Sequence, residues 1–164
     1  MKTHFSGLQF KDFVTLASVA AGVASIAFSL EKNFAYAAVA IAFAAAFDFL
    51  DGKVARSSKG GDAFGRELDS LVDAFSFGAA PAALVLSQKI GLLAGIAAVA
   101  YTCAGVVRLA RFNLQERKGV FVGLPIPAAA VIVSLAASYS QPAGVAAMLL
   151  AAVAMVLDFE LKKI

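Results

Sequence analysis

Six apolar segments, each roughly 20 residues long, dominate this sequence of 164 residues. A helix needs about 20 mostly apolar residues to cross the hydrocarbon core of a bilayer. The composition agrees with such crossings: 61% of the residues are hydrophobic and 15% are charged, against about 45–50% and about 25% in soluble domains. We therefore expect an all-α membrane protein with a bundle of six transmembrane helices, near residues 12–30, 34–56, 65–87, 90–112, 121–139 and 142–159.

The number and length of these segments, together with the composition, limit the number of domains and the class of protein. Six crossings leave only short connections, so we expect a single membrane domain over residues 1–164. The hydrophobic surplus excludes a disordered chain, a disulfide scaffold and an ordinary cytosolic enzyme. The polar start, Met1–Phe5, lacks a charged region followed directly by an apolar run, so we expect no cleavable signal peptide.

Small residues in the apolar segments suggest where helices pack. Gly91 and Gly95 are four residues apart and are expected to form a packing face, because small side chains let helix backbones approach. Cys103, the single cysteine, lies in an apolar run and cannot form an intrachain disulfide. We expect it to be a small packing residue.

The basic residues indicate an orientation. Of the 14 lysines and arginines, only Lys32 and Lys89 fall at one side of the predicted bundle, and the others fall at the side that holds both termini. Because basic residues favour the cytoplasmic side, we expect both termini in the cytoplasm. The sequence therefore predicts a multi-pass protein of the cytoplasmic membrane.

Four acidic residues lie inside or beside the second and third segments, where they are energetically expensive and are functional candidates by default. Asp48 and Asp51 are three residues apart, and Asp69 and Asp73 are four apart, so each pair shares one helix face. The connection between the segments is short, so the two helices are expected to be antiparallel neighbours. Both pairs should then lie at the same depth, and the site should face the cytoplasm.

Four converging carboxylates repel one another unless protons, cations or metal ions lie among them. Oxygen-only ligands favour Mg²⁺ or Mn²⁺, and four carboxylates can hold two ions. Two-metal sites suit phosphoryl transfer. The structural alternative is that these acids pair with Lys53, Arg56 and Arg66 at the membrane interface.

The pattern Asp48-x-x-Asp51-Gly52-x-x-Ala55-Arg56, eight residues, then Gly65-x-x-x-Asp69-x-x-x-Asp73 resembles the signature of the CDP-alcohol phosphotransferases. Three further stretches resemble the phosphatidylserine synthase branch of that family. They are Asp69–Asp73 followed by Ser76-Phe77-Gly78-Ala79-Ala80-Pro81, then Arg108-Leu109-Ala110-Arg111-Phe112-Asn113, and Gly123-Leu124-Pro125-Ile126-Pro127.

The resemblance implies transfer of a phosphatidyl or archaetidyl group from a CDP-linked lipid to the hydroxyl of L-serine, with release of CMP. It implies two divalent ions, Mg²⁺ or Mn²⁺, and a homodimer in the membrane. It also implies the roles of the signature residues: Asp48, Asp51, Asp69 and Asp73 as metal ligands, Asp73 also as the catalytic base, and Thr15, Gly52, Ala55, Arg56 and Gly65 as the CDP-lipid site.

The acceptor alcohol depends on residues outside that signature. Arg108 and Arg111 lie one turn apart near the end of the fourth segment, with Asn113 just beyond. A guanidinium fork suits the carboxylate of serine, so these three residues are the expected serine site. The alternative for the arginines is anchoring at the membrane surface.

One departure from the family pattern lies in the first segment. Thr15 matches, but Asp12 stands where family members often carry an asparagine, and Ser18 stands where serine synthases often have another.

Two other functions remain open. One is a sister enzyme with glycerol 3-phosphate or an inositol phosphate as acceptor, and the other is a cation transporter that uses the aspartates as its ion path.

Overall fold

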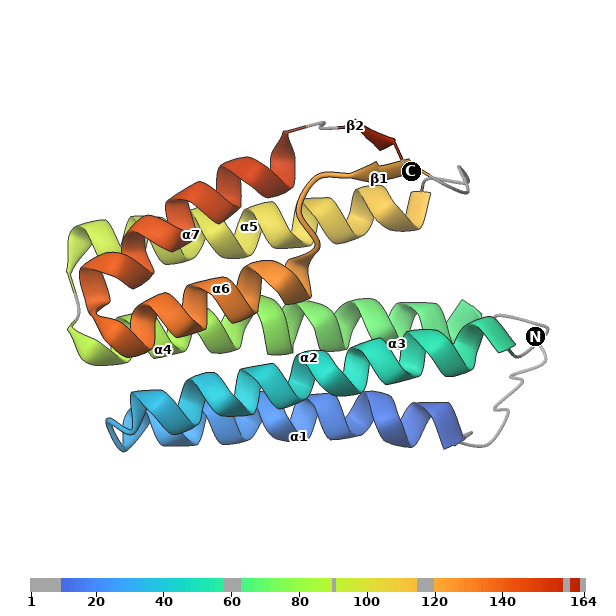
Figure 1. The fold of residues 1–164 in the computed structure, drawn as a ribbon, viewed down its shortest axis with the longest axis horizontal. Coiled ribbons are helices and arrows are strands. Elements are labelled where there is room, and N and C mark those ends of the chain that lie inside the picture. The colour runs from blue at the N-terminus through green and yellow to red at the C-terminus, as the bar shows by residue number, and fades with distance from the viewer. Residues whose placement is uncertain (1–9, 58–62, 90, 115–119, 158–159, 163–164) are drawn as a thin grey trace, which may run out of the picture.

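The computed structural model describes residues 10–57, 63–89, 91–114, 120–157 and 160–162. These residues are almost entirely helical, with one short antiparallel pair of strands (Figure 1). The elements are α1 (Phe10–Leu30), α2 (Phe34–Ser57), α3 (Ala63–Asp73), the π-helix η1 (Ala74–Ala79), α4 (Ala80–Gln88), α5 (Leu92–Leu114), β1 (Val120–Val122), α6 (Ile126–Tyr139), α7 (Gln141–Val156) and β2 (Glu160–Lys162).

The predicted all-α bundle is confirmed. Each predicted segment corresponds to one rod, by which we mean a single helix or a direct succession of helices. The third rod is α3, η1 and α4 in direct succession. The largest error concerns the fifth segment, which was expected to begin at residue 121 but begins as α6 at Ile126. Pro125 and Pro127 have no N–H to donate, and Gly123 has a left-handed φ of 73°, so regular helix starts only after this turn.

Three helical stretches have the length and apolar composition of a full membrane crossing: Phe13–Leu30, Glu67–Gln88 and Leu92–Asn113. Three more are shorter apolar helices: Phe34–Leu50, Ile126–Tyr139 and Gln141–Val156. The 14 residues of α6 reach about 21 Å, less than the roughly 30 Å of a hydrocarbon core. The six expected crossings are therefore three long and three short apolar helices.

The rods alternate in direction, so the bundle has two ends, and the described turns from α1 to α2 and from α6 to α7 lie at the same one (Figure 1). One end holds the start of α1, the end of α2, the start of α3 and the end of α5. The other end holds the turn between α1 and α2, which contains Lys32, and the end of α4, which Lys89 follows. These are the two basic residues that the sequence set apart from the rest. There the Lys32 ammonium group donates to the carbonyl of Ser87 and ties the α1–α2 turn to α4.

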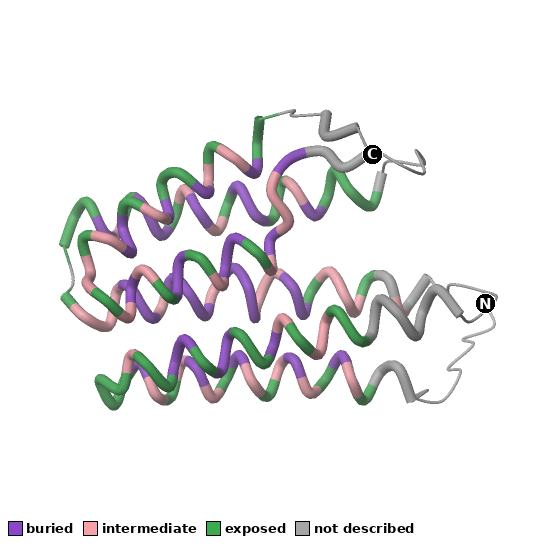
Figure 2. Tube along the Cα trace, in the orientation of Figure 1, coloured by how far each residue is buried: buried purple, intermediate pink, exposed green. Residues whose placement is uncertain are grey.

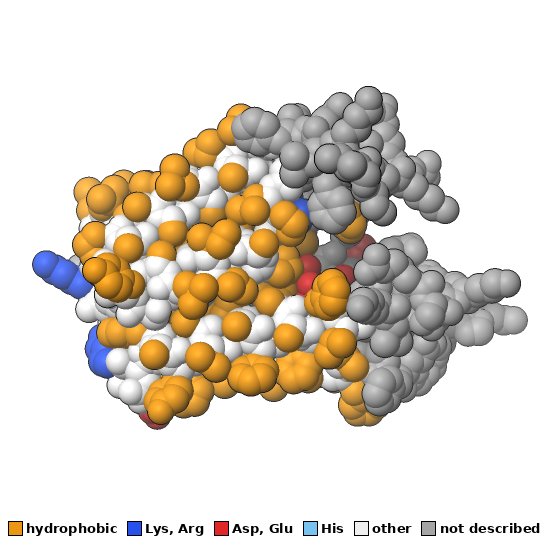
Figure 3. Space-filling view, viewed as in Figure 1, with side chains coloured by type: hydrophobic (Ala, Val, Ile, Leu, Met, Phe, Trp, Pro, Cys, Tyr) orange, Lys and Arg blue, Asp and Glu red, His pale blue; other side chains and the backbone are white. Residues whose placement is uncertain are grey.

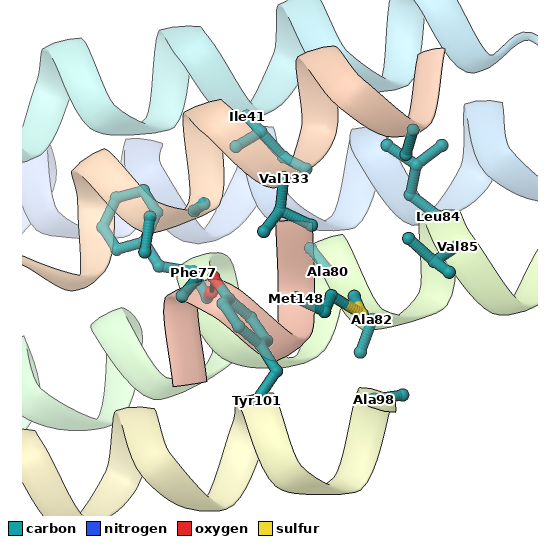
Figure 4. Close-up of a cluster of buried hydrophobic side chains, with 14 of the residues drawn as sticks. Ile41, Phe77, Ala80, Ala82, Leu84, Val85, Ala98, Tyr101, Val133 and Met148 are labelled. Atoms are coloured by element: carbon teal, nitrogen blue, oxygen red, sulfur yellow. Dashed lines mark hydrogen bonds between the residues drawn. The ribbon is translucent and has the colours of Figure 1, made fainter. Parts of the chain in front are cut away.

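The core lies around η1, which contacts α1, α2, α5 and α6. Tyr101 and Phe77 are its largest completely buried side chains, and they meet between α5 and η1 (Figure 4). Buried residues line the inner faces of all the rods, whereas their outer faces are exposed (Figure 2). The element at the centre of this bundle is thus a π-helix and not a regular α-helix.

On the face seen in Figure 3, the side chains exposed between the two ends are mainly hydrophobic, as expected for helices in contact with lipid. Two packing expectations, for the glycine pair Gly91 and Gly95 and for Cys103, are not met within the described residues. No described atom lies within 4 Å of a methyl group placed on Gly91 or Gly95, so these glycines do not pack within the described chain. Cys103 is exposed rather than packed. Both features belong to the outer face of the bundle.

Candidate functional site

Three carboxylates from two rods converge at the end of the bundle where α2 stops and α3 begins. Asp48, Asp69 and Asp73 each place a carboxylate oxygen within 4.8 Å of the other two. Asp69 and Asp73 are one turn apart on α3, and Asp48 approaches from α2, as the spacing predicted. Figure 3 shows acidic side chains in a recess at this end, beside hydrophobic ones.

Asp73 is the most enclosed of the three, with 9% of its surface exposed. Its carboxyl group is hydrogen-bonded to Asp48, while its Oδ1 atom is buried and accepts no hydrogen bond from the described residues. Ionised carboxylates are acceptors only, so two of them in contact require a proton or a cation between them. The buried Oδ1 atom adds a ligand position that the described chain leaves unused.

Among the described residues, Arg108 brings positive charge to this site. It lies on α5, is partly buried, and interacts electrostatically with Asp73. Its Nε atom is buried and donates no hydrogen bond to any described residue. A buried N–H without an acceptor is unfavourable, so this atom is suited to an anionic group that binds beside Asp73.

The described acids fit a hard divalent cation. All the converging donors are carboxylate oxygens, which Mg²⁺ and Mn²⁺ prefer. Metal–oxygen distances of about 2.0–2.6 Å place two ligands of one ion within about 5 Å of each other, and the three oxygens lie within 4.8 Å. The buried, unused Oδ1 atom of Asp73 points to the same conclusion.

The other two predicted serine ligands take part in contacts between helices. The guanidinium of Arg111 donates to the carbonyl oxygen of Val156 at 3.2 Å and joins α5 to the end of α7. The side-chain amide of Asn113 donates to Ser70 Oγ at 2.8 Å and joins α5 to α3. The structure therefore places Arg108 beside the acids and gives Arg111 and Asn113 partners on neighbouring elements.

The predicted CDP-lipid residues are only partly described. Thr15 is buried on α1, which contacts both α2 and α3. Gly65 lies on α3, one turn before Asp69. Four other predicted site residues lie on α2, in a part whose side chains the structure does not describe: Asp51, Gly52, Ala55 and Arg56. The side chains of the two alternative pairing partners, Lys53 on α2 and Arg66 on α3, also lie outside the description.

The sequence reading did not assign the residues that hold η1 in place. Tyr101 OH donates to the carbonyl oxygen of Phe77 at 2.7 Å, and Ser76 Oγ donates to that of Ser18 at 3.1 Å. A tyrosine in the middle of an apolar segment was the available signal, because a buried hydroxyl usually has a partner. The partner itself depends on tertiary packing.

Residues 9–159 match the CDP-alcohol phosphatidyltransferase family. The chain belongs to this family. Asp48, Asp69 and Asp73, which converge in the structure, are three of the four aspartates in the pattern that resembles the family signature.

Several relatives carry names of serine enzymes. The chain is 40% identical over 125 residues to the CDP-diacylglycerol–serine O-phosphatidyltransferase of Methanocaldococcus jannaschii, covering 76% of this chain and 58% of that protein. It is 35% identical over 170 residues to the archaetidylserine synthase of Methanothermobacter thermautotrophicus, covering 97% and 72%. The chain thus spans between about half and three quarters of these relatives' lengths.

A solved structure supports the fold assignment. The phosphatidylinositol phosphate synthase of Mycobacterium tuberculosis, crystallised with CDP-DAG bound, matches with a TM-score of 0.67 and 28% identity. The match covers 92% of this chain and 82% of that one. The membrane bundle described above is therefore also the fold of a family member with a different named product.

Proposed function

We propose that this chain transfers a phosphatidyl or archaetidyl group from a CDP-linked lipid to the hydroxyl of L-serine and releases CMP. The observation that carries the proposal is the meeting of three carboxylates within 4.8 Å of one another, with the Arg108 guanidinium beside Asp73. Family membership supports the CDP-linked donor. The names of the two archaeal relatives support serine as the acceptor.

Asp48, Asp69 and Asp73 are proposed to hold the divalent cation, Mg²⁺ or Mn²⁺, and Asp51 to complete the ligand set for a second ion. When bound, the ions neutralise charge on the pyrophosphate and on the departing CMP. Arg56 is proposed to contact the same phosphates as a fork of donors. Thr15, Gly52, Ala55 and Gly65 are proposed to line the CDP-lipid site, where small residues leave room for the nucleotide.

Asp73 is proposed as the general base, because it is the buried carboxylate next to the basic group that suits the acceptor. A serine hydroxyl is a weak nucleophile at neutral pH and needs a base within about 2.6–3.2 Å. In the proposed step, the serine oxygen bonds to the lipid-side phosphorus and its proton passes to Asp73. The phosphoanhydride bond breaks, and CMP leaves with the electron pair.

Arg108 is proposed to bind the serine carboxylate, because its buried Nε–H has no acceptor among the described residues. A carboxylate bound to this guanidinium places the acceptor directly beside Asp73. Arg111 and Asn113 are proposed to complete the acceptor side while they fix α5 against α7 and α3. A glycerol 3-phosphate or inositol phosphate acceptor would present a phosphate to the same arginines, and the assay below separates these cases.

The proposal includes the setting of the enzyme. The chain acts as a single membrane domain with both termini and the site at the cytoplasmic side, where nucleotide-linked substrates are present. The positive-inside distribution supports this orientation. A homodimer is proposed as well, as the resemblance to the family implies.

The test is a CMP-release assay on the purified chain in detergent, with CDP-diacylglycerol or CDP-archaeol, Mn²⁺, and one of three acceptors: serine, glycerol 3-phosphate or an inositol phosphate. We expect release that depends on serine, together with a serine phospholipid product. Asp69→Asn should abolish it, whereas Glu67→Gln, an exposed acid on the same helix, should not. Release that depends on glycerol 3-phosphate or on an inositol phosphate would instead identify the sister activity, and no release with any acceptor would contradict the proposal.

A further inference from the structure

The helix that carries Asp69 and Asp73 changes its hydrogen-bond pattern directly after Asp73. In η1 the Ala80 N–H donates to the Phe75 carbonyl, five residues earlier rather than four. Pro81 follows and has no N–H, so an α-helical partner for the Phe77 carbonyl is missing. Pro81 thus explains why a π-helical turn forms at this place; we call this turn, η1, the wide turn.

Tyr101 supplies the missing donor from another helix. Its hydroxyl donates to the Phe77 carbonyl at 2.7 Å, and its side chain is completely buried. Figure 4 shows the ring extending from α5 toward Phe77. The other two tyrosines, Tyr36 and Tyr139, are 63% and 89% exposed, so only Tyr101 has this position.

The opposite side of the wide turn is fixed by α1. Ser76 Oγ donates to the Ser18 carbonyl at 3.1 Å, and Ser18 Oγ donates to the Ala44 carbonyl on α2 at 3.3 Å. Gly22, one turn after Ser18, leaves no room for a side chain: an added Cβ would lie 3.0 Å from Ser76 Oγ. Hydrogen bonds therefore hold η1 between α1 and α5.

A wide turn contains one residue more than an α-helical turn. That residue offsets the helix before η1 from the helix after it by about 100° of rotation and about 1.5 Å of rise. Asp73 is the last residue before the offset, and the buried residues of α4 come after it. The turn thus sets how the acids are rotated relative to the packed core.

We propose that Pro81 and Tyr101 are positioning residues for Asp69 and Asp73: they fix the wide turn that points both carboxylates toward Asp48, and that of Asp73 toward Arg108. The inference rests on the proposed function, because it concerns the same acids. Neither residue contacts the reacting atoms. Their effect passes through the backbone of η1.

The test compares Pro81→Ala, which restores an N–H, and Tyr101→Phe, which removes the hydroxyl, with Tyr139→Phe as the matched control. Mn²⁺ binding is measured by electron paramagnetic resonance, and kcat, KM and the thermal midpoint are measured on the same preparations. We expect Pro81→Ala and Tyr101→Phe to lower Mn²⁺ affinity about 10-fold and kcat about 10- to 100-fold, as misplacement by about 1 Å does. KM for the CDP-lipid should change by less than about threefold.

Pro81→Ala separates positioning from stability. The added N–H gives the Phe77 carbonyl a helical partner, so its thermal midpoint should not fall although its kcat falls. Wild-type kcat and Mn²⁺ affinity in both folded variants would overturn the positioning role while leaving the proposed function intact. A wild-type protein that neither binds Mn²⁺ nor releases CMP would overturn both.

Discussion

The neighbours of Asp73 determine whether its carboxyl group can carry a negative charge. Asp48 and Asp69 bring negative charge, Arg108 brings positive charge, and burial removes most of the solvent. A carboxylate in such a place is unstable without a cation or a proton, which is why we assign it to catalysis rather than to the fold. In the proposed function, its neighbour Asp69 on α3 binds metal and its neighbour Arg108 on α5 binds the acceptor.

Replacing Asp73 with Asn should remove turnover and spare much of the nucleotide binding. The amide keeps the size of the side chain but accepts no proton, so kcat should fall by about 10²–10⁴-fold. CMP release gives the rate, and isothermal titration with CDP gives the binding constant. Retained turnover would exclude Asp73 as the base.

Arg108→Lys should raise KM for serine at least about 10-fold and change KM for the CDP-lipid much less. Lysine keeps the charge but loses the planar fork and the buried Nε–H that the guanidinium directs to the acceptor. Steady-state kinetics with each substrate varied in turn measures the two constants. An equal increase in both constants would place Arg108 outside the acceptor site.

At the scale of elements, close backbone approach joins the helices. Gly144 on α7 faces α6 so closely that an added Cβ would lie 2.8 Å from Ala137 Cβ and 3.0 Å from Ala137 Cα. The second of these atoms is backbone, which moves only with the helix. Side-chain amides strengthen the same region: Gln88 donates to the Ala137 carbonyl at 2.8 Å, and Gln141 donates to the Val85 carbonyl at 3.0 Å.

Gly144→Ala should therefore destabilise the bundle by about 1–3 kcal/mol, as overpacking does. Gly95→Ala is the matched control, because no described atom lies within 4 Å of its added Cβ, and alanine is a better helix former than glycine by about 0.5–1 kcal/mol. Thermal unfolding in detergent measures both. A Gly144→Ala protein at least as stable as Gly95→Ala would contradict the packing of α6 against α7.

The helices could be predicted from the sequence, whereas the π-helical turn within one of them could not. Apolar length located the six rods, and the spacing of Asp69 and Asp73 predicted their common face, because both depend on local periodicity. The wide turn after Asp73 was not predicted, since a reading in steps of 3.6 residues assumes a regular helix. The Arg111 contact with Val156 was out of reach for another reason: its two residues are brought together only by tertiary packing.

At the scale of the whole molecule, the two ends of the bundle differ in chemistry. The site end gathers the acids and Arg108, while the opposite end holds Lys32 and Lys89 and the short turns between rods. An apolar belt separates the ends (Figure 3). This arrangement suits an enzyme whose lipid substrate stays in the bilayer while the nucleotide group reaches the surface.

The proposed orientation predicts that Lys32 faces away from the cytoplasm. In a Cys103→Ser background, Lys32→Cys should react with a membrane-impermeant maleimide added to intact cells, because the positive-inside rule places the α1–α2 turn outside. The Cys103→Ser parent is the control for background labelling. Labelling only after the cells are opened would reverse the orientation.

Whether the three carboxylates share a metal ion can be measured by anomalous diffraction from crystals of the full chain soaked in Mn²⁺. We expect a manganese peak between Asp48, Asp69 and Asp73, at about 2.0–2.6 Å from their carboxylate oxygens. Crystals that hold Mn²⁺ elsewhere, or three carboxylates that turn away from one another with no peak between them, would contradict it.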